Sequence, residues 1–165
     1  MNSLGSYLEN PHFDYRTIKE AVNFFGDALR VNSTSSLSSV SSSANEDLIK
    51  LRQTAMKKNS FTEEMISKFE INLINLLIAT SSYERKILKF YDLPDIFIKA
   101  AKGISGFELK RQYFPDRLVM NISHTTITML PYGSDAPYQF DLSYNIWDGD
   151  WFSNESITPD PTLKD

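Results

Sequence analysis

Apolar residues near the start of the chain recur at helical spacing. Steps of four, three and four positions separate Ile18, Val22, Phe25 and Leu29. This spacing predicts an amphipathic helix over residues 15–31. Its apolar stripe has to dock, either on the chain's own domain or in a groove of a partner chain.

A serine-rich stretch follows this first helix. Eight of the eleven residues from 33 to 43 are serine, and such a segment buries too little apolar area to offset the entropy cost of ordering it. We therefore expect an N-terminal tail with a tethered helix over residues 1–32 and a flexible linker over 33–44. A compact α+β domain over 45–153 and a flexible tail over 154–165 complete the predicted organisation.

The next segments indicate two helices joined by a short turn. The first begins at Asn45, a good N-cap, and continues to about Asn59. The sequence Ser60-Phe61-Thr62-Glu63 then matches a capping box, and a mostly apolar series alternates steps of three and four from Ile66 to Phe90. We interpret the two helices as an antiparallel helical hairpin.

The pattern changes after a further short helix, which Pro94 and Gly103 delimit. Apolar and polar residues alternate over residues 118–122, threonine and other β-branched residues dominate 125–130, and a clean alternation runs over 138–146. A period of two with β-branched and aromatic residues predicts strands. The C-terminal part is therefore expected to be a sheet.

Together these elements predict an α+β fold. N-terminal helices with a long helical hairpin would pack on a C-terminal three- to four-stranded antiparallel sheet. The helical hairpin is expected to cover the sheet face that carries Tyr138, Phe140, Leu142, Tyr144 and Ile146. Because the helices precede the strands instead of alternating with them, the pattern argues against doubly wound nucleotide-binding folds.

Composition narrows the possible chemistry. The 165-residue chain has no cysteine and two histidines, which excludes thiol catalysis and cysteine-ligated metals and leaves too few imidazoles for a typical zinc site. We expect neither a cofactor nor a metal. No apolar run approaches the roughly 20 residues of a membrane helix, and the N-terminus lacks a signal-peptide pattern. We therefore expect a cytoplasmic protein without a membrane partner.

Charge is distributed unevenly along the chain. The net charge is -4, and residues 118–165 hold seven acidic side chains against one lysine. Phosphate backbones would repel so acidic a surface, and we do not expect nucleic-acid binding. The basic residues of the helical part are interpreted as a solvated surface: Lys50, Arg52, Lys57, Lys58, Lys99, Lys102, Lys110 and Arg111.

The motif Trp147-Asp148-Gly149-Asp150-Trp151 is the most distinctive in the chain. Asp148-Gly149 is the preferred dipeptide of a two-residue hairpin turn. The motif is either a structural turn whose tryptophans cover the sheet or an acidic, aromatic tip that anchors a partner protein. Together with Tyr132, the same residues could alternatively bind a small ligand or a carbohydrate.

A hydrolytic site is a third possibility. His124 and Asp141 could form a triad with a nearby serine, but the chain contains no Gly-x-Ser-x-Gly nucleophile elbow. We therefore place a hydrolase behind the binding hypotheses.

By elimination, we expect a non-catalytic protein–protein interaction or assembly subunit that binds another protein or a second copy of itself. The tethered first helix, the acidic aromatic hairpin, or both would form the contact. The candidate partner-binding residues are Ile18, Val22, Phe25, Leu29, Trp147, Asp148, Asp150 and Trp151.

Overall fold

The structure is a computed structural model that describes residues 15–34, 46–53, 55–80, 86–115, 118–131 and 141–154. The described helices are α2 (Tyr15–Val31), α3 (Glu46–Arg52), α4 (Glu63–Thr80) and α5 (Asp95–Ala101), with a 3₁₀ turn η1 (Arg111–Tyr113). The strands are β1 (Lys86–Phe90), β2 (Leu118–Ile122), β3 (Thr126–Pro131), β4 (Asp141–Asn145) and β5 (Asp150–Asn154). The predicted α+β class is confirmed.

The strands form one antiparallel meander in the order β1-β2-β3-β4-β5. Each strand pairs with its neighbour in sequence, and the register places Met120 opposite both Leu88 and Met129. Side chains of residues that are paired on neighbouring strands therefore point to the same face of the sheet and form rows across it. The row that contains Met120 faces the helices: Met120, Met129 and Leu142 lie in the core, and Leu88 packs against it.

The predicted long helix is wrong beyond Thr80. Helix α4 ends there, and the following segment contributes the edge strand β1, so the sheet has five strands instead of three or four. In β1, Leu88 and Phe90 face the core while Ile87 is exposed. These residues satisfy a period of two as well as helical steps, and the antiparallel pairing with β2 selects the strand.

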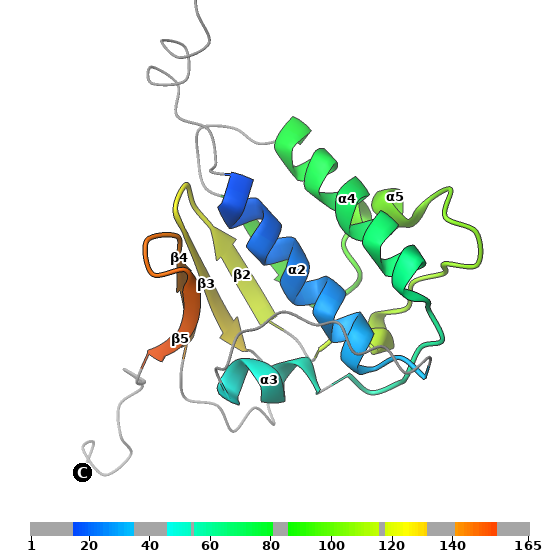
Figure 1. Ribbon diagram of the computed structural model, residues 1–165, viewed down its shortest axis with the longest axis horizontal. Helices are drawn as coiled ribbons and strands as arrows, with labels where there is room; N and C mark the ends of the chain where they lie inside the picture. The colour runs from blue at the N-terminus through cyan, green and yellow to red at the C-terminus, as the bar shows by residue number, and fades with distance from the viewer. Residues whose placement is uncertain are drawn as a thin grey trace, which may run out of the picture.

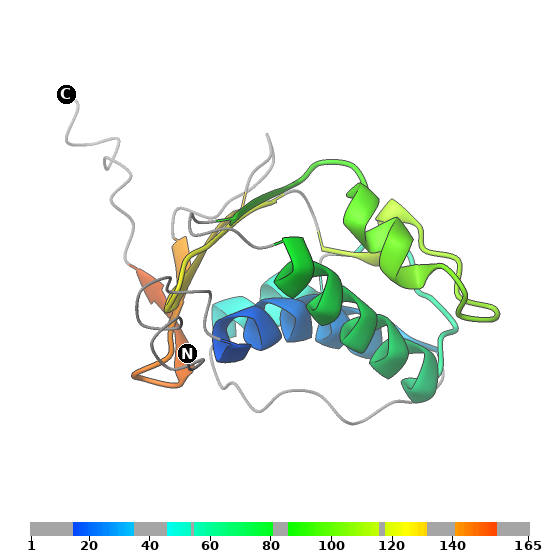
Figure 2. The ribbon, with the colours of Figure 1, turned by 90° about the horizontal axis from the view of Figure 1, so that it is seen from above.

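The two long helices α2 and α4 form the antiparallel helix pair. They lie side by side on one face of the sheet, and α2 packs directly against β2 and β3 (Figures 1 and 2). The predicted hairpin between residues 45–59 and 61–90 therefore does not form, because α3 is a short helix that ends at Arg52 and packs on α2. No described helix covers the opposite face of the sheet (Figure 2).

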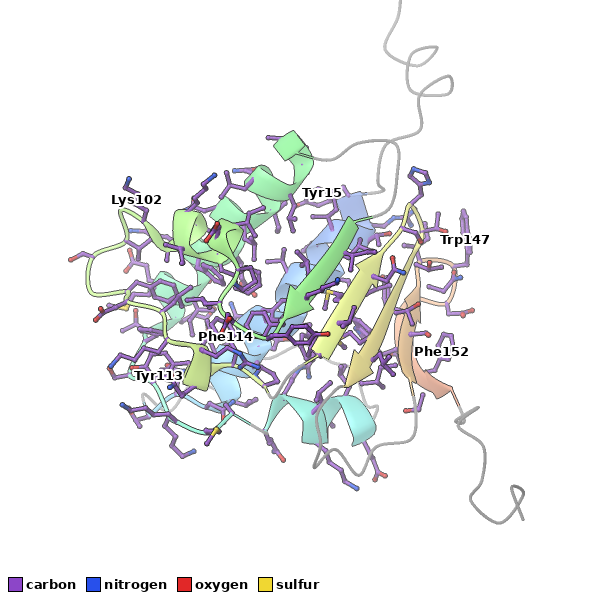
Figure 3. The ribbon with its side chains drawn as sticks, turned by 180° about the vertical axis from the view of Figure 1, so that it is seen from behind. Tyr15, Lys102, Tyr113, Phe114, Trp147 and Phe152 are labelled. Carbon is purple, nitrogen blue, oxygen red and sulfur yellow. The ribbon has the colours of Figure 1, made fainter. Side chains whose placement is uncertain are left out.

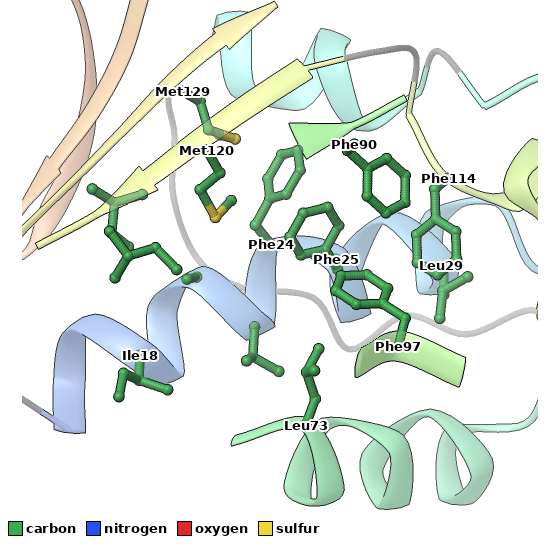
Figure 4. Close-up of a cluster of buried hydrophobic side chains, with 14 of the residues drawn as sticks. Ile18, Phe24, Phe25, Leu29, Leu73, Phe90, Phe97, Phe114, Met120 and Met129 are labelled. Carbon is green, nitrogen blue, oxygen red and sulfur yellow. The ribbon is translucent and has the colours of Figure 1, made fainter. Parts of the chain in front are cut away.

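Aromatic side chains fill the centre of the core (Figure 4). The ring centroid of Phe25 lies 5.1 Å from that of Phe90, 4.9 Å from Phe97 and 6.2 Å from Phe114. The contacts with Phe97 and Phe114 are edge-to-face, an arrangement that aromatic quadrupoles favour. Phe25 thus connects α2 to β1, to α5 and to the segment before β2.

Two buried asparagines complete the C-terminal end of α2. The Asn32 amide donates to the carbonyls of Ala28 at 2.7 Å and Arg52 at 2.9 Å, and the Asn59 amide donates to the Leu29 carbonyl at 3.0 Å. These bonds satisfy carbonyl groups that a helix end leaves without intrahelical partners. The same bonds tie α2 to the end of α3 and to the segment before α4.

Helix α2 belongs to the same packed core as the elements that follow it. Of the predicted linker, the structure describes Ser33 and Thr34, and the Ser33 hydroxyl donates to the Phe61 carbonyl at 2.9 Å. The rest of the predicted linker and the predicted tail after Asn154 lie outside the described residues.

Candidate functional site

The four candidate partner-binding residues of the first helix are buried in the chain's own core. Ile18, Val22, Phe25 and Leu29 are at most 2% exposed. All four belong to the core, and Figure 4 shows Phe25 among the rings of Phe90, Phe97 and Phe114. Because α2 docks within its own chain, this stripe offers no surface to a partner in this structure.

The hairpin residues lie together at the tip of β4 and β5. The connecting loop has four residues, Ile146–Gly149, instead of the two-residue turn predicted from Asp148-Gly149. Asn145 organises this loop: its carbonyl accepts hydrogen bonds from the amides of Asp148 at 3.1 Å and Gly149 at 2.9 Å. Its side-chain Oδ1 also accepts the Trp147 amide at 2.8 Å. Gly149 has a φ of +71°, which glycine adopts without strain.

The two tryptophans of the motif have opposite environments. Trp147 is 75% exposed and projects from the loop, whereas Trp151 is 3% exposed (Figure 3). The Trp151 ring lies 5.6 Å from Tyr144 and 6.4 Å from Phe24, so it anchors the hairpin on α2. Trp147 is therefore the accessible aromatic of the motif, and it stands with exposed Asp148 and Asp150.

The alternative hypothesis is a carbohydrate site in which the sugar stacks on both tryptophans. Such a site requires both tryptophans to lie on the surface. Burial of Trp151 removes one of them, and Tyr132 lies outside the described residues.

A polar contact joins the buried tryptophan to α2. The Trp151 indole N–H donates to Glu20 Oε2 at 2.7 Å. Burial raises the pKa of the Glu20 carboxyl above its ordinary value, although the indole hydrogen bond and nearby Arg52 act to lower it. Asp27 and Asp150 add to the increase through like-charge repulsion.

Replacing Glu20 with glutamine should remove a pH dependence of stability. Because the Glu20 pKa is raised by folding, its favourable contribution is complete below the unfolded-state pKa and is lost as pH rises through the folded-state pKa. The amide oxygen of Glu20→Gln can still accept the indole N–H. We expect the variant to gain stability relative to the wild type as pH rises above the ordinary pKa of a glutamate, as measured by urea unfolding. The exposed Glu64→Gln serves as control, and a pH-independent difference for Glu20→Gln would contradict the assignment.

The two tryptophans should also differ in their effect on stability. Trp151→Phe removes the hydrogen bond to half-buried Glu20 and should cost about 1–2 kcal/mol of unfolding free energy. Trp147→Ala should change it by no more than about 0.5 kcal/mol, because Trp147 is exposed. Urea unfolding followed by circular dichroism distinguishes the two, and a larger loss for Trp147→Ala would refute these placements.

The structure does not bring the candidate hydrolytic residues together. His124 lies in the turn between β2 and β3, where its carbonyl accepts the Thr17 hydroxyl at 3.0 Å. Thr126 pairs with Asn145 across β3 and β4, whereas Asp141 is at the other end of β4. Asp141 lies four positions before Asn145 along the strand, a distance of about 13 Å. The hydrolase hypothesis therefore loses its geometric basis.

Two of the basic residues interpreted as solvated have structural roles. Arg52 is 3% exposed, and its Nη2 lies 3.6 Å from Asp27 Oδ2. Arg111 donates from Nε to the Tyr91 carbonyl at 3.0 Å and from Nη2 to the Phe90 carbonyl at 3.1 Å. That part of the prediction is wrong, because both side chains join elements that are distant in sequence.

A charge cluster between α2 and α4, buried except for the partly exposed Glu63, was not predicted from the sequence. Arg30 lies at its centre, and all of its guanidinium nitrogens donate to carboxylates. Nε and Nη2 contact Glu63 at 3.0 and 2.8 Å, and Nη1 contacts Asp27 at 2.8 Å. Nη1 and Nη2 also contact the two oxygens of Glu70 at 2.8 and 2.7 Å. We call Asp27, Arg30, Glu63 and Glu70 the charge cluster.

The charge cluster holds α2 and α4 in register. Burial alone would lower the pKa of Arg30, but the hydrogen bonds that Arg30 donates to Glu70 and Glu63 raise it above its ordinary value. Burial raises the pKa of Glu70 although Arg30 acts to lower it, and the nearby carboxylates Asp27 and Glu63 add to the increase. Every guanidinium nitrogen already has a carboxylate partner, so the cluster is suited to joining helices and not to binding a substrate.

A single glycine was the sequence signal for this cluster. Gly26 interrupts the apolar stripe of α2, and glycine within a helix often marks a close approach of another element. A Cβ atom at this position would overlap the Glu70 carboxylate. The glycine therefore makes room for the contact between the two helices.

Comparison with known proteins adds no assignment: no protein-family model, curated protein or solved structure matches the chain. Within the described ranges, no group of three or more histidine, aspartate or glutamate side chains is arranged to hold a metal ion. None of the described helices has the length and apolarity needed to span a membrane.

Proposed function

We propose that the chain is a protein–protein interaction module that binds a partner protein through the tip of the β4–β5 hairpin. One observation carries the proposal: Trp147 is 75% exposed on a loop whose backbone is fixed by three hydrogen bonds to Asn145. Tryptophan is enriched among residues that dominate binding energy, and a preordered anchor loses little conformational entropy on binding.

The charge around Trp147 indicates the chemistry of the partner. Asp148 and Asp150 are exposed beside it. They form no ion pair with a described cation. An acidic surface with an aromatic anchor favours a segment that carries lysine or arginine, because complementary charge accelerates association and excludes wrong partners.

The edge of the sheet supports an extended partner segment. Strand β5 is the last strand, and no described strand pairs with its outer side. The outer side of an edge strand can bind an added strand. Phe152, at 40% exposed, supplies a second apolar contact on β5. We therefore propose that a basic, extended segment binds along β5, with an apolar side chain against Trp147.

Selection from a displayed library of random peptides tests this function. The full chain is the target, and Trp147→Ala is the counter-target. We expect enriched peptides to be rich in lysine and arginine and to bind Trp147→Ala at least about tenfold more weakly, the effect of removing an energetic hot spot. Ile78→Ala, an exposed site on α4, is the matched control. Peptides that bind wild type and Trp147→Ala equally well would refute the proposal.

A further inference from the structure

A pocket lies at the other end of the molecule, after α5. Figure 3 places Lys102, on its rim, on the opposite side of the molecule from Trp147. The pocket has a volume of about 670 Å³, within the range of small-molecule sites. We call it the α5 pocket, and its lining residues are Leu93, Ile98, Lys99, Ala101, Lys102, Gly103, Ile104, Phe107, Glu108 and Leu109.

The apolar wall of the α5 pocket is fixed by the core behind it. Phe107 is 5% exposed, and its ring centroid lies 4.2 Å from Phe61 and 5.3 Å from Phe69. The loop in front is closed by two backbone hydrogen bonds, from Ile104 N–H to the Ala101 carbonyl and from Phe107 N–H to the Ile104 carbonyl, each 3.2 Å. The pocket is thus largely preformed.

The polar groups of the α5 pocket are mainly cationic. Lys99 and Lys102 stand three positions apart at the end of α5, and both are exposed. Neither forms an ion pair with a described residue. Glu108 is the one acidic lining residue, so the lining carries a net positive charge. Gly103, between the lysines and the apolar wall, has no atom within 4 Å of a Cβ position, which leaves the space beside this glycine open.

We propose that the α5 pocket binds a small amphipathic carboxylate. Its apolar body would pack on Ile104, Phe107 and Leu109, and its carboxylate would form charge-assisted contacts with Lys99 and Lys102. The apolar wall and the two ammonium groups provide complementary contacts for the two parts of such a molecule. This site is independent of the hairpin, so either proposal can fail without the other.

Titration with octanoate and 1-octanol tests the ligand class. The two probes share an apolar chain and differ in the charge of the head group. Amide chemical shifts of the full chain should change saturably for octanoate at α5 and at residues 103–109. Calorimetry should show that 1-octanol binds at least about tenfold more weakly, as expected when a charged contact is lost. Equal affinities, no saturable shifts, or shifts confined to other residues would overturn the proposal.

Charge reversal on the rim provides the matched test. The double variant Lys99→Glu/Lys102→Glu changes two exposed side chains, and octanoate should bind it at least about tenfold more weakly while 1-octanol binding is unchanged. The variant Lys19→Glu/Lys50→Glu makes the same change in net charge at exposed positions outside the pocket. An equal loss in both variants would assign the effect to net charge and refute a site at the α5 pocket. Unchanged octanoate affinity in Lys99→Glu/Lys102→Glu would also refute it.

Discussion

Replacing Arg30 with methionine is expected to lower the free energy of unfolding by about 3–5 kcal/mol, the usual cost of removing one partner of a buried ion pair. Arg30 is 8% exposed and donates to Asp27, Glu63 and Glu70. Methionine preserves much of the apolar volume but supplies no donor. Asp27 and Glu70, both less than 10% exposed, would then lose their contacts with this guanidinium.

Urea unfolding measures this loss, with Lys19→Met on the exposed surface of the same helix as the control. Lys19→Met should change stability by no more than about 0.5 kcal/mol. Adding Glu70→Gln to Arg30→Met should recover part of the loss, because the uncompensated carboxylate causes much of it. A loss below about 1 kcal/mol for Arg30→Met would show that the charge cluster does not hold the helices together.

Gly26→Ala is expected to destabilise the chain by about 2 kcal/mol, although helix propensity alone predicts a gain of about 1 kcal/mol. The added methyl group would overlap the Glu70 carboxylate. A flexible glutamate could usually move aside, but both oxygens of Glu70 are held by Arg30 at 2.7 and 2.8 Å. The helices must therefore separate or the ion pair must break.

A double-mutant cycle isolates this steric effect. In a Glu70→Ala background the overlapping carboxylate is absent, so Gly26→Ala should become neutral or stabilising. The measurement is urea unfolding of the wild type, the two single variants and the double variant. If Gly26→Ala were as destabilising without Glu70 as with it, contact with this carboxylate could not be the cause.

The sequence predicts the elements whose hydrophobic pattern is unambiguous. The stripe from Ile18 to Leu29 predicts α2, and Pro94 and Gly103 bracket α5 correctly. Beyond Thr80 the pattern permits both a helix and a strand, and pairing with β2, which is separated in sequence, decides between them. The predicted pairing of α4 with the helix just before it is wrong for a similar reason. Whether α4 packs against α3 or against α2 depends on contacts between residues that are distant in sequence.

The sequence predicts the β4–β5 hairpin but not the environments of its side chains. Local composition identifies the hairpin and its Asp148-Gly149 turn, but the four-residue loop, set by Asn145, determines which tryptophan is exposed. The local sequence does not show that Trp151 is a core residue, because Glu20 and Phe24, which it contacts, lie more than a hundred positions away in the chain. The charge cluster joins two helices that are separated in sequence, and Gly26 is its one local signal.

Site-specific photo-crosslinking tests the central proposal most directly. The full chain carries a benzoylphenylalanine at position 147 or, as control, at exposed position 78, in an extract of cells that make the protein. We predict cross-links specific to position 147, on partner peptides rich in lysine and arginine, that are lost when Asp148→Asn and Asp150→Asn are added. Binding through the hairpin would be contradicted if no cross-links formed at position 147, or if position 78 gave equally abundant products. It would also be contradicted if the products did not change when the two aspartates are replaced.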